Sequence, residues 1–176
     1  MIALPDRLQR GLAHPLFPGA AIAALGFGIL AGAYVFEYIG GLKPCPLCLE
    51  QRVPWFILIA LGGAISAATI AKAPRAILLL LYTAAIGVAL WGVYLGGYHA
   101  GVEYKWWPGP QKCSGTLQPS DGGLLGPLSP NEIVRCDEIP WALFGVISLA
   151  GFNFLFSIVA AGLAAFGLKA AISEAR

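Results

Sequence analysis

Long apolar stretches dominate the pattern of hydrophobic and polar positions along this chain. Glu37 is their only charged residue, and they cover about 17–39, 53–71, 76–96 and 141–168. Each reaches roughly the 20 residues that a helix needs to cross the hydrocarbon core of a bilayer. A soluble helical core would show polar faces repeating at the helical period, and these stretches show none. The pattern therefore predicts an all-α integral membrane protein built as an antiparallel bundle of four transmembrane helices.

The composition supports this interpretation. The chain of 176 residues is 58% hydrophobic and only 11% charged, which is too apolar for an ordinary soluble protein. Its length fits one domain, and we expect a single four-helix membrane domain over residues 1–176. The formal net charge is only +2 and the basic residues form no run, so the sequence does not suggest nucleic-acid binding.

The placement of lysine and arginine predicts how the bundle crosses the membrane. Basic residues in short flanking loops favour the cytoplasmic side. They occur here at Arg7 and Arg10, before the first apolar stretch, and in the short turn 71–75. Both termini are therefore expected in the cytoplasm, with outer loops at about 40–52 and 97–140. All four cysteines then lie outside the cytoplasm, where disulfides can persist.

The first apolar stretch has a second interpretation. Basic residues precede it, and the Ala-Gly-Ala sequence at 31–33 resembles the cleavage site of a removable signal peptide. Cleavage would leave three spans, and the apolar run continues beyond this site through Tyr34, Val35 and Phe36. We therefore expect the first stretch to be a retained span.

A Cys-x-x-Cys pair lies between the first two apolar stretches. Cys45 and Cys48 can close a small disulfide ring, and such a motif lowers the thiolate pKa of one of its sulfurs. Arg52 follows Cys48 by four residues, so on a helix both lie on the same face. The start of that helix stays open: it begins near Pro54, or it begins at Pro46 and Pro54 bends it.

A second cysteine pair lies in the large outer loop. A disulfide between Cys113 and Cys136 would close a loop of about 24 residues, which stabilises a fold by roughly 3 kcal/mol on the chain-entropy model. Such a bond could be purely structural. Tyr104–Trp107, at the start of the loop, is typical of an interfacial anchor. Gly and Pro residues around 120–130 predict a mobile segment.

Three polar residues near or within the apolar stretches each allow two interpretations. His99 is an interfacial histidine bonded to backbone or water, or it contacts a cofactor head group beside Arg52. Glu37 is an interfacial carboxylate or a proton-handling group. Asn153 hydrogen-bonds a neighbouring helix or contacts a cofactor directly.

The cysteines together favour redox exchange over metal binding. The second pair is not at zinc-ligand spacing, so we expect no metal site. Two disulfides, one beside the membrane and one in a loop, suit a relay of thiol–disulfide exchange that needs a final electron acceptor. The sequence has no haem, flavin or nicotinamide motif. A lipid-soluble quinone needs only an apolar crevice with a polar end, which Cys48 and Arg52 could supply.

At these residues the chain resembles a known family. The stretch Leu42–Arg52 after a first span is similar to the signature of DsbB, the quinone-dependent oxidase that regenerates periplasmic disulfide donors. Cys136-Asp137, followed by Trp141 and Phe144-Gly145, extends the resemblance over nearly the whole chain. The vitamin K epoxide reductase family fits less well, because its Cys-x-x-Cys lies near the last spans.

The resemblance implies a fold, a location and a relay. The fold would be four antiparallel helices, with a short membrane-parallel helix in the large periplasmic loop that matches Tyr104–Trp107. The location would be the bacterial inner membrane, with the cysteines on the periplasmic side. A reduced thioredoxin-fold partner similar to DsbA would attack Cys113. Its mate Cys136 would then attack the Cys45–Cys48 bond.

The resemblance also implies a quinone site. Cys48 would remain as a thiolate facing ubiquinone (or menaquinone), and Arg52 would hold the quinone and stabilise that charge. His99 matches a histidine near the quinone by its position before the loop. Three alternatives stay open: a paralogue with a specialised partner, a conduit that carries electrons outward without quinone, and a structural membrane protein with stapled loops.

Overall fold

The computed structural model describes residues 16–113 and 134–173 of the chain. Arg7 and Arg10, used above for the orientation, lie outside the described residues. The Gly- and Pro-rich segment around 120–130, for which we expected mobility, also lies outside them.

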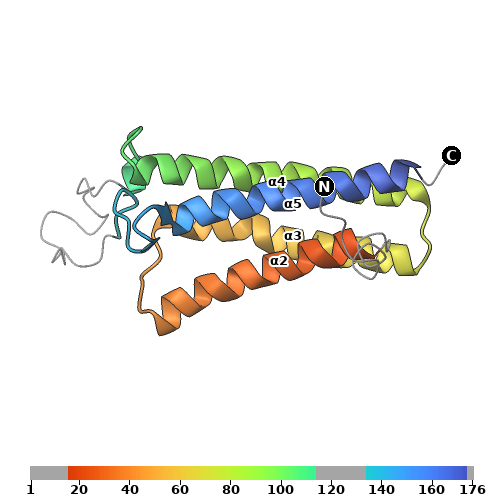
Figure 1. The fold of residues 1–176 in the computed structure, drawn as a ribbon, viewed down its shortest axis with the longest axis horizontal. Coiled ribbons are helices and arrows are strands. Elements are labelled where there is room, and N and C mark those ends of the chain that lie inside the picture. The colour runs from red at the N-terminus through yellow and green to blue at the C-terminus, as the bar shows by residue number, and fades with distance from the viewer. Residues whose placement is uncertain (1–15, 114–133, 174–176) are drawn as a thin grey trace, which may run out of the picture.

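Four long helices make up most of the described structure. They are α2 (Phe17–Tyr34), α3 (Pro46–Ile70), α4 (Arg75–Glu103) and α5 (Leu149–Ser173). They pack side by side and antiparallel, with the α2–α3 and α4–α5 connections at one end and the α3–α4 turn at the other (Figure 1). Within the described residues, these four helices are long and apolar enough to cross a membrane. The prediction of an all-α four-helix membrane bundle is confirmed.

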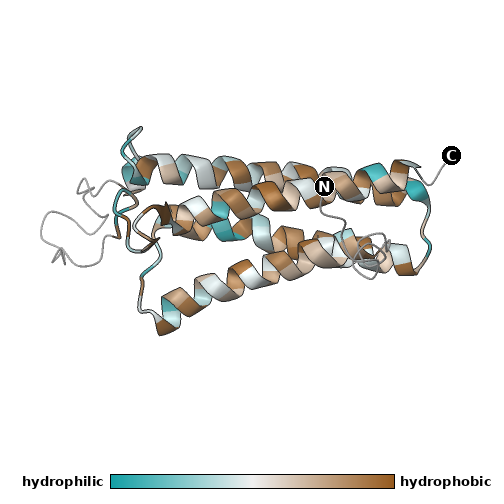
Figure 2. Ribbon diagram, viewed as in Figure 1, coloured by the Kyte–Doolittle hydropathy of each residue, from teal (hydrophilic) through white to brown (hydrophobic). Residues whose placement is uncertain are grey.

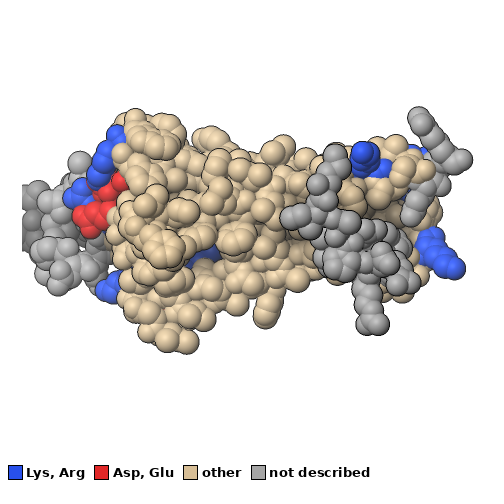
Figure 3. Space-filling model, viewed as in Figure 1, with Lys and Arg blue, Asp and Glu red and all other residues tan. Residues whose placement is uncertain are grey.

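The outer surface of the bundle is apolar along its length. Large side chains such as Phe27, Leu80 and Phe166 are at least half exposed. Apolar residues prevail along all four helices (Figure 2), and on the visible face charged residues gather mainly at the two ends (Figure 3). A soluble protein rarely exposes so continuous an apolar surface, whereas a bilayer requires one. The chain is a multi-pass membrane protein.

Helix α3 begins at Pro46, seven residues before the expected start at 53. Pro46 suits a first helical position because its ring presets φ and its missing N–H would have no helical partner. Cys45 caps the helix: its backbone is extended and its Sγ accepts a hydrogen bond from the Cys48 backbone N at 3.2 Å. Pro54 lies inside the same continuous helix and is buried. The question of where this helix starts is thus decided in favour of Pro46.

Helix α4 extends to Glu103, beyond the expected end at 96. The short helix expected at Tyr104–Trp107 is not formed there, and these residues make turns and bends instead. Lys105 has a positive φ of 60°, which reverses the chain, and the Trp107 indole N–H then donates to the Tyr98 carbonyl at 2.9 Å. In the described part of the loop, only Gln111–Cys113 is helical, as a single 3₁₀ turn.

A small hairpin precedes α5, which begins at Leu149 rather than at 141. Strand β1 (Ala142–Leu143) pairs antiparallel with β2 (Ile147–Ser148). The turn between them has positive φ at both central residues, Phe144 and Gly145, as in a type I′ turn. Apolar residues 141–148 therefore form a cap at the loop end of the bundle instead of the first turns of a span.

Small residues bring α4 and α5 into close contact. Ala85, Ala89, Gly92 and Gly96 of α4 are buried, and so are Ser157, Ala160 and Ala164 of α5. Close approach of backbones is a common way for helices to associate in lipid, where no hydrophobic driving force acts between them. Asn153 of α5, which also lies against Gly96 of α4, accepts a hydrogen bond from the Trp55 indole of α3 at 2.6 Å. This bond confirms the expected contact of Asn153 with a neighbouring helix.

We predict that Gly96→Ala destabilises the bundle by about 1–3 kcal/mol, because an added Cβ would lie 2.7 Å from the Phe154 backbone N and force α4 and α5 apart. Gly87→Ala on the same helix is the matched control, since a Cβ there meets nothing within 4 Å. Thermal unfolding in detergent should show a lower midpoint for Gly96→Ala only. Equal midpoints for the two variants would mean that the α4–α5 contact is looser than described.

Candidate redox site at the loop end of the bundle

The fold brings all four cysteines to the loop end of the bundle. Cys113 and Cys136 are joined by a disulfide with an S–S length of 2.06 Å. Cys45 and Cys48 are free thiols whose Sγ atoms lie 2.7 Å apart. One buried apolar cluster contains Cys45, Leu47, Val102, Cys113 and Cys136. The two pairs are distant in sequence and adjacent in space.

The start of α3 sets the chemistry of the inner pair. Cys48 lies in the first turn, where the helix dipole favours a negative charge. Cys45 lies just before the helix and is almost fully buried. A side-chain hydrogen bond with Cys48, followed by burial, raises the pKa of the Cys45 thiol well above its ordinary value. Cys45 therefore keeps its proton, and the more exposed Cys48 is the sulfur better placed to react.

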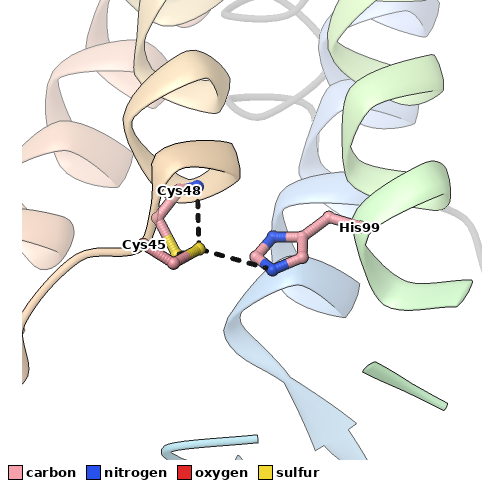
Figure 4. Close-up of side chains that lie close together, drawn as sticks. All are labelled: Cys45, Cys48 and His99. Atoms are coloured by element: carbon pink, nitrogen blue, oxygen red, sulfur yellow. Dashed lines mark hydrogen bonds between the residues drawn. The ribbon is translucent and has the colours of Figure 1, made fainter. Parts of the chain in front are cut away.

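His99 of α4 lies against this pair rather than at an open interface. Its Nε2 is 3.6 Å from the Cys45 Sγ (Figure 4), and its Nδ1 is 2.5 Å from the Gln51 Nε2. That amide nitrogen also donates to the Leu47 carbonyl at 3.3 Å, which identifies it as the donor. Nδ1 is then the acceptor, so His99 is neutral with its proton on Nε2, directed toward Cys45.

Gln51 was not singled out in the sequence, although a signal was available. It follows Cys48 by three residues, so on a helix that starts at Pro46 the two lie on neighbouring positions of one face. The same spacing argument that placed Arg52 beside Cys48 therefore applies to Gln51.

Arg52 does not stand alone. Its guanidinium Nη2 lies 2.6 Å from the Glu37 Oε2, and its Cζ lies 4.8 Å from the centroid of the Tyr34 ring. Glu37 is carried by a π-helical turn, Val35–Ile39, that continues α2. Such turns often occur at functional sites. Glu37 is therefore the counter-charge of Arg52, a pairing that the sequence pattern did not reveal.

A second acidic group, Glu103, was also missed. It is the last residue of α4 and is 5% exposed. The Ser148 hydroxyl donates a hydrogen bond to its Oε2, and its Oε1 lies 3.9 Å from the His99 Nε2. The available signal was its spacing of four residues from His99, which places both on one helical face.

A cavity of about 280 Å³ opens beside these groups. Its walls are mostly apolar, from residues such as Leu30, Phe36, Trp55 and Phe156. Its charged and polar lining residues are Glu37, Lys43, Cys48, Gln51, Arg52, His99, Glu103 and Asn153. The Asn153 Nδ2 is buried and has no hydrogen-bond partner among the described residues. An apolar pocket with a few convergent polar groups is the usual form of a small-molecule site.

The inner pair and His99 could also hold a metal ion while the cysteines are reduced. The two Sγ atoms and a ring nitrogen of His99 lie within 4.8 Å of one another. Thiolate sulfur and imidazole nitrogen are typical zinc ligands. Closing the Cys45–Cys48 disulfide would remove two of these three ligands.

The outer disulfide is tied to the end of α4 by charge. The Lys105 Nζ donates to the backbone carbonyl of Asp137 at 2.5 Å and to its Oδ2 at 2.6 Å. Arg135 donates to both carboxylate oxygens of Asp137 at 2.9–3.0 Å. Hydrogen bonds from Arg135 and then Lys105 hold the pKa of Asp137 well below its usual range. These bonds from Lys105 and Arg135, called the Asp137 clamp below, hold in place the residue that follows Cys136.

Comparison with known proteins gives one family. The family model described as "Disulfide bond formation protein DsbB" matches residues 17–167. Several bacterial proteins named "Disulfide bond formation protein B" are similar to this chain. The relative from Acinetobacter baumannii is 32% identical over 84% of this chain and 89% of its own length. The relative from Xanthomonas oryzae pv. oryzae is 29% identical over 86% of this chain and 90% of its own length.

The third relative, from Ralstonia nicotianae, is 33% identical over a shorter region. That match covers 44% of this chain and 45% of the relative. No solved structure matches the chain.

We predict that limited alkylation of the reduced protein labels Cys48 before Cys45. Burial and the raised pKa of the Cys45 thiol keep it unreactive, whereas Cys48 is partly exposed near a helix N-terminus. Peptide mass spectrometry after short exposure to iodoacetamide would measure the order. Equal labelling of both sulfurs would contradict the asymmetry of the pair.

We also predict that Asp137→Asn makes the Cys113–Cys136 disulfide easier to reduce with dithiothreitol, because the clamp to Lys105 and Arg135 loses its charge. Glu138→Gln is the control, since Glu138 is mostly exposed and contacts only Arg135 among these groups.

The same clamp should depend on pH. The folded-state pKa of Asp137 is depressed, so the clamp is fully present above the unfolded pKa of aspartate and is lost as pH falls through the folded value. The difference between wild type and Asp137→Asn should therefore shrink in acid, and a difference that grew in acid would refute this role.

Proposed function

This chain belongs to the DsbB family of disulfide bond formation proteins, and on that premise we propose that it is a quinone-dependent thiol oxidase of the bacterial inner membrane. It reoxidises the dithiol of a periplasmic, thioredoxin-fold partner similar to DsbA and passes the electrons to ubiquinone or menaquinone. Both termini lie in the cytoplasm and the cysteines face the periplasm.

One observation carries this proposal: the Cys113–Cys136 disulfide and the Cys45/Cys48 pair share one buried cluster. Disulfide exchange requires a thiolate to reach a disulfide sulfur directly. Clustering of the two pairs supports exchange between them without rearrangement of the helices.

The exchange proceeds by successive displacements. A partner thiolate attacks the Cys113 Sγ, and Cys136 leaves as a thiolate. Cys136 then attacks the Cys45 Sγ of the oxidised inner pair, and Cys48 leaves as a thiolate. The second thiolate of the partner attacks the partner sulfur bound to Cys113, which forms the partner disulfide and releases Cys113. Cys113 finally attacks the Cys136 Sγ, which restores the outer disulfide and releases Cys45, and Cys45 takes up a proton from the partner dithiol. Cys113 and Cys136 are both fully buried, so the partner reaches Cys113 only after its surroundings open. Neighbouring Arg52 and the α3 N-terminus favour the negative charge left on Cys48.

The residues around the cavity fit a quinone head group. The volume of about 280 Å³ is near the lower end of the roughly 300–1,000 Å³ of small-molecule sites. Its apolar walls suit a ring and an isoprenoid tail. The buried Asn153 Nδ2, which has no partner among the described residues, and the Arg52 guanidinium are donors for its carbonyl oxygens. A quinone in this cavity would accept two electrons and two protons.

The quinone is needed on energetic grounds. A DsbA-like dithiol has a potential of about −120 mV, so transfer of its electrons to ordinary disulfides is uphill. A deficit of about 100 mV in a two-electron couple corresponds to about 4.6 kcal/mol. Oxidation of the inner pair by quinone offsets this deficit.

The direct test is oxidation of a reduced DsbA-like protein by the purified protein in lipid nanodiscs containing ubiquinone. We expect partner dithiol and quinone to disappear in equal amounts, and Cys113→Ser to abolish both losses. Disulfides that resist the partner would favour a stapled structural protein. Thiol loss without quinone consumption would favour a conduit that carries electrons elsewhere.

We predict that Arg52→Ala raises the KM for quinone roughly 10- to 100-fold, the range expected when a hydrogen bond to a charged group worth about 1.5–3 kcal/mol is lost. Exchange between the partner and the Cys113–Cys136 disulfide should persist, since Arg52 does not belong to that cluster. Arg75→Ala is the control, because Arg75 begins α4 at the opposite end of the bundle. Loss of partner exchange in Arg52→Ala would contradict the assigned role.

A further inference from the structure

A buried carboxyl group lines the cavity and has no part in the exchange described above. Glu103 is 5% exposed, and no lysine or arginine among the described residues lies within 4 Å of it. Acidic side chains are rarely buried in this way unless paired, and ionisable groups at membrane depth usually have a function.

One hydrogen-bond donor and one polar ring face this carboxyl group. The Ser148 hydroxyl, from the strand before α5, donates to Oε2. The His99 Nε2 lies 3.9 Å from Oε1, beyond hydrogen-bond distance, and carries the ring proton because Gln51 occupies Nδ1. The bond from Ser148 favours the ionised form of Glu103, so the site can hold a carboxylate although the cavity is apolar.

The other charged groups of the cavity set the charges of Glu103 and Cys48 against each other. Two cations, Arg52 and Lys43, are among its lining residues. Glu37 neutralises Arg52 at 2.6 Å, and Lys43 is exposed and makes no ion pair with Glu103 within 4 Å. A Cys48 thiolate and a Glu103 carboxylate would then be two negative charges around one small apolar space. Like charges in such a site oppose each other, so ionisation of one disfavours ionisation of the other.

Resting on the proposed quinone chemistry, we propose that Glu103 is the proton donor of the cavity. It holds a proton while Cys48 is a thiolate and releases it to the reduced quinone when Cys48 forms its disulfide with Cys45. Glu103 then carries the negative charge that Cys48 has lost.

The step balances in electrons, protons and charge. The reduced site contains the Cys45 thiol, the Cys48 thiolate and the Glu103 carboxyl group. The Cys45–Cys48 bond forms, and the two sulfurs together give up two electrons to one quinone. The thiol proton of Cys45 and the carboxyl proton of Glu103 end on the two oxygens of the quinol. Glu103 takes up a proton again when the next dithiol is oxidised.

The test uses infrared difference spectroscopy on the full-length protein without quinone, reduced with dithiothreitol against oxidised. We expect the C=O stretch of a protonated carboxyl group to appear on reduction in wild type and to be absent in Glu103→Gln. Glu138→Gln should retain it, because Glu138 is an exposed residue of the outer loop. With quinone added, the Glu103→Gln variant should reduce quinone roughly 100-fold more slowly than wild type. This is the lower end of the rate effect expected when a general acid is lost.

The experiment distinguishes proton donation by Glu103 from a purely structural role. Glutamine keeps an oxygen that accepts from Ser148, so a structural role predicts normal quinone reduction in Glu103→Gln. Ser148→Ala keeps the carboxyl group and should keep the infrared band. A band that persists in Glu103→Gln, a band lost equally in Ser148→Ala, or wild-type quinone reduction by Glu103→Gln would each overturn the proposal. Failure of the partner reaction would instead count against the proposed function, since the infrared measurement uses neither partner nor quinone.

Discussion

The start of α3 is the constraint on which the rest of the site depends. Pro46 at the first helical position and the Cys45 sulfur as cap fix where the helix begins. From that point the 3.6-residue period places Cys48, Gln51 and Arg52 on neighbouring positions of one face. The same cap directs the Cys48 backbone N toward the Cys45 sulfur, so helix formation and proximity of the two thiols result from one local structure.

The membrane environment explains why the polar side chains of the site occur in pairs. Charges and donors buried at this depth are costly unless they find partners. Arg52 has Glu37, His99 has Gln51, and Glu103 has Ser148, with the two partners on different elements in each case. These contacts join α3 to the π-helical turn after α2, α3 to α4, and α4 to the hairpin before α5, while small residues bring α4 and α5 together along their length. The Asn153 amide, only half satisfied among the described residues, marks the place where a further acceptor would fit.

The loop end consists of an inner layer that closes the bundle and an outer layer attached to it. The hairpin before α5 and the turn after α4 close the bundle, and the Asp137 clamp holds the outer disulfide against α4. Burial of Cys113 and Cys136 protects that disulfide from adventitious thiols. Access must therefore come from local opening of this layer, whose buried cluster is smaller than the one between the helices.

The sequence by itself determined the four spans, the two cysteine pairs and the family, because bilayer thickness and Cys-x-x-Cys chemistry leave direct marks on residue type and spacing. It misplaced the start of the last span: apolar residues 141–148 form a hairpin, since hydropathy does not distinguish a span from the apolar cap above it. The family resemblance implied a short helix at Tyr104–Trp107, and these residues form turns instead. Which residues share the cavity was decided only by tertiary structure. Glu37 and Arg52, or His99 and Gln51, are far apart in the chain, and their pairing depends on how the helices are rotated against one another. That rotation is set by packing of small and large side chains across the whole bundle, which no local pattern records.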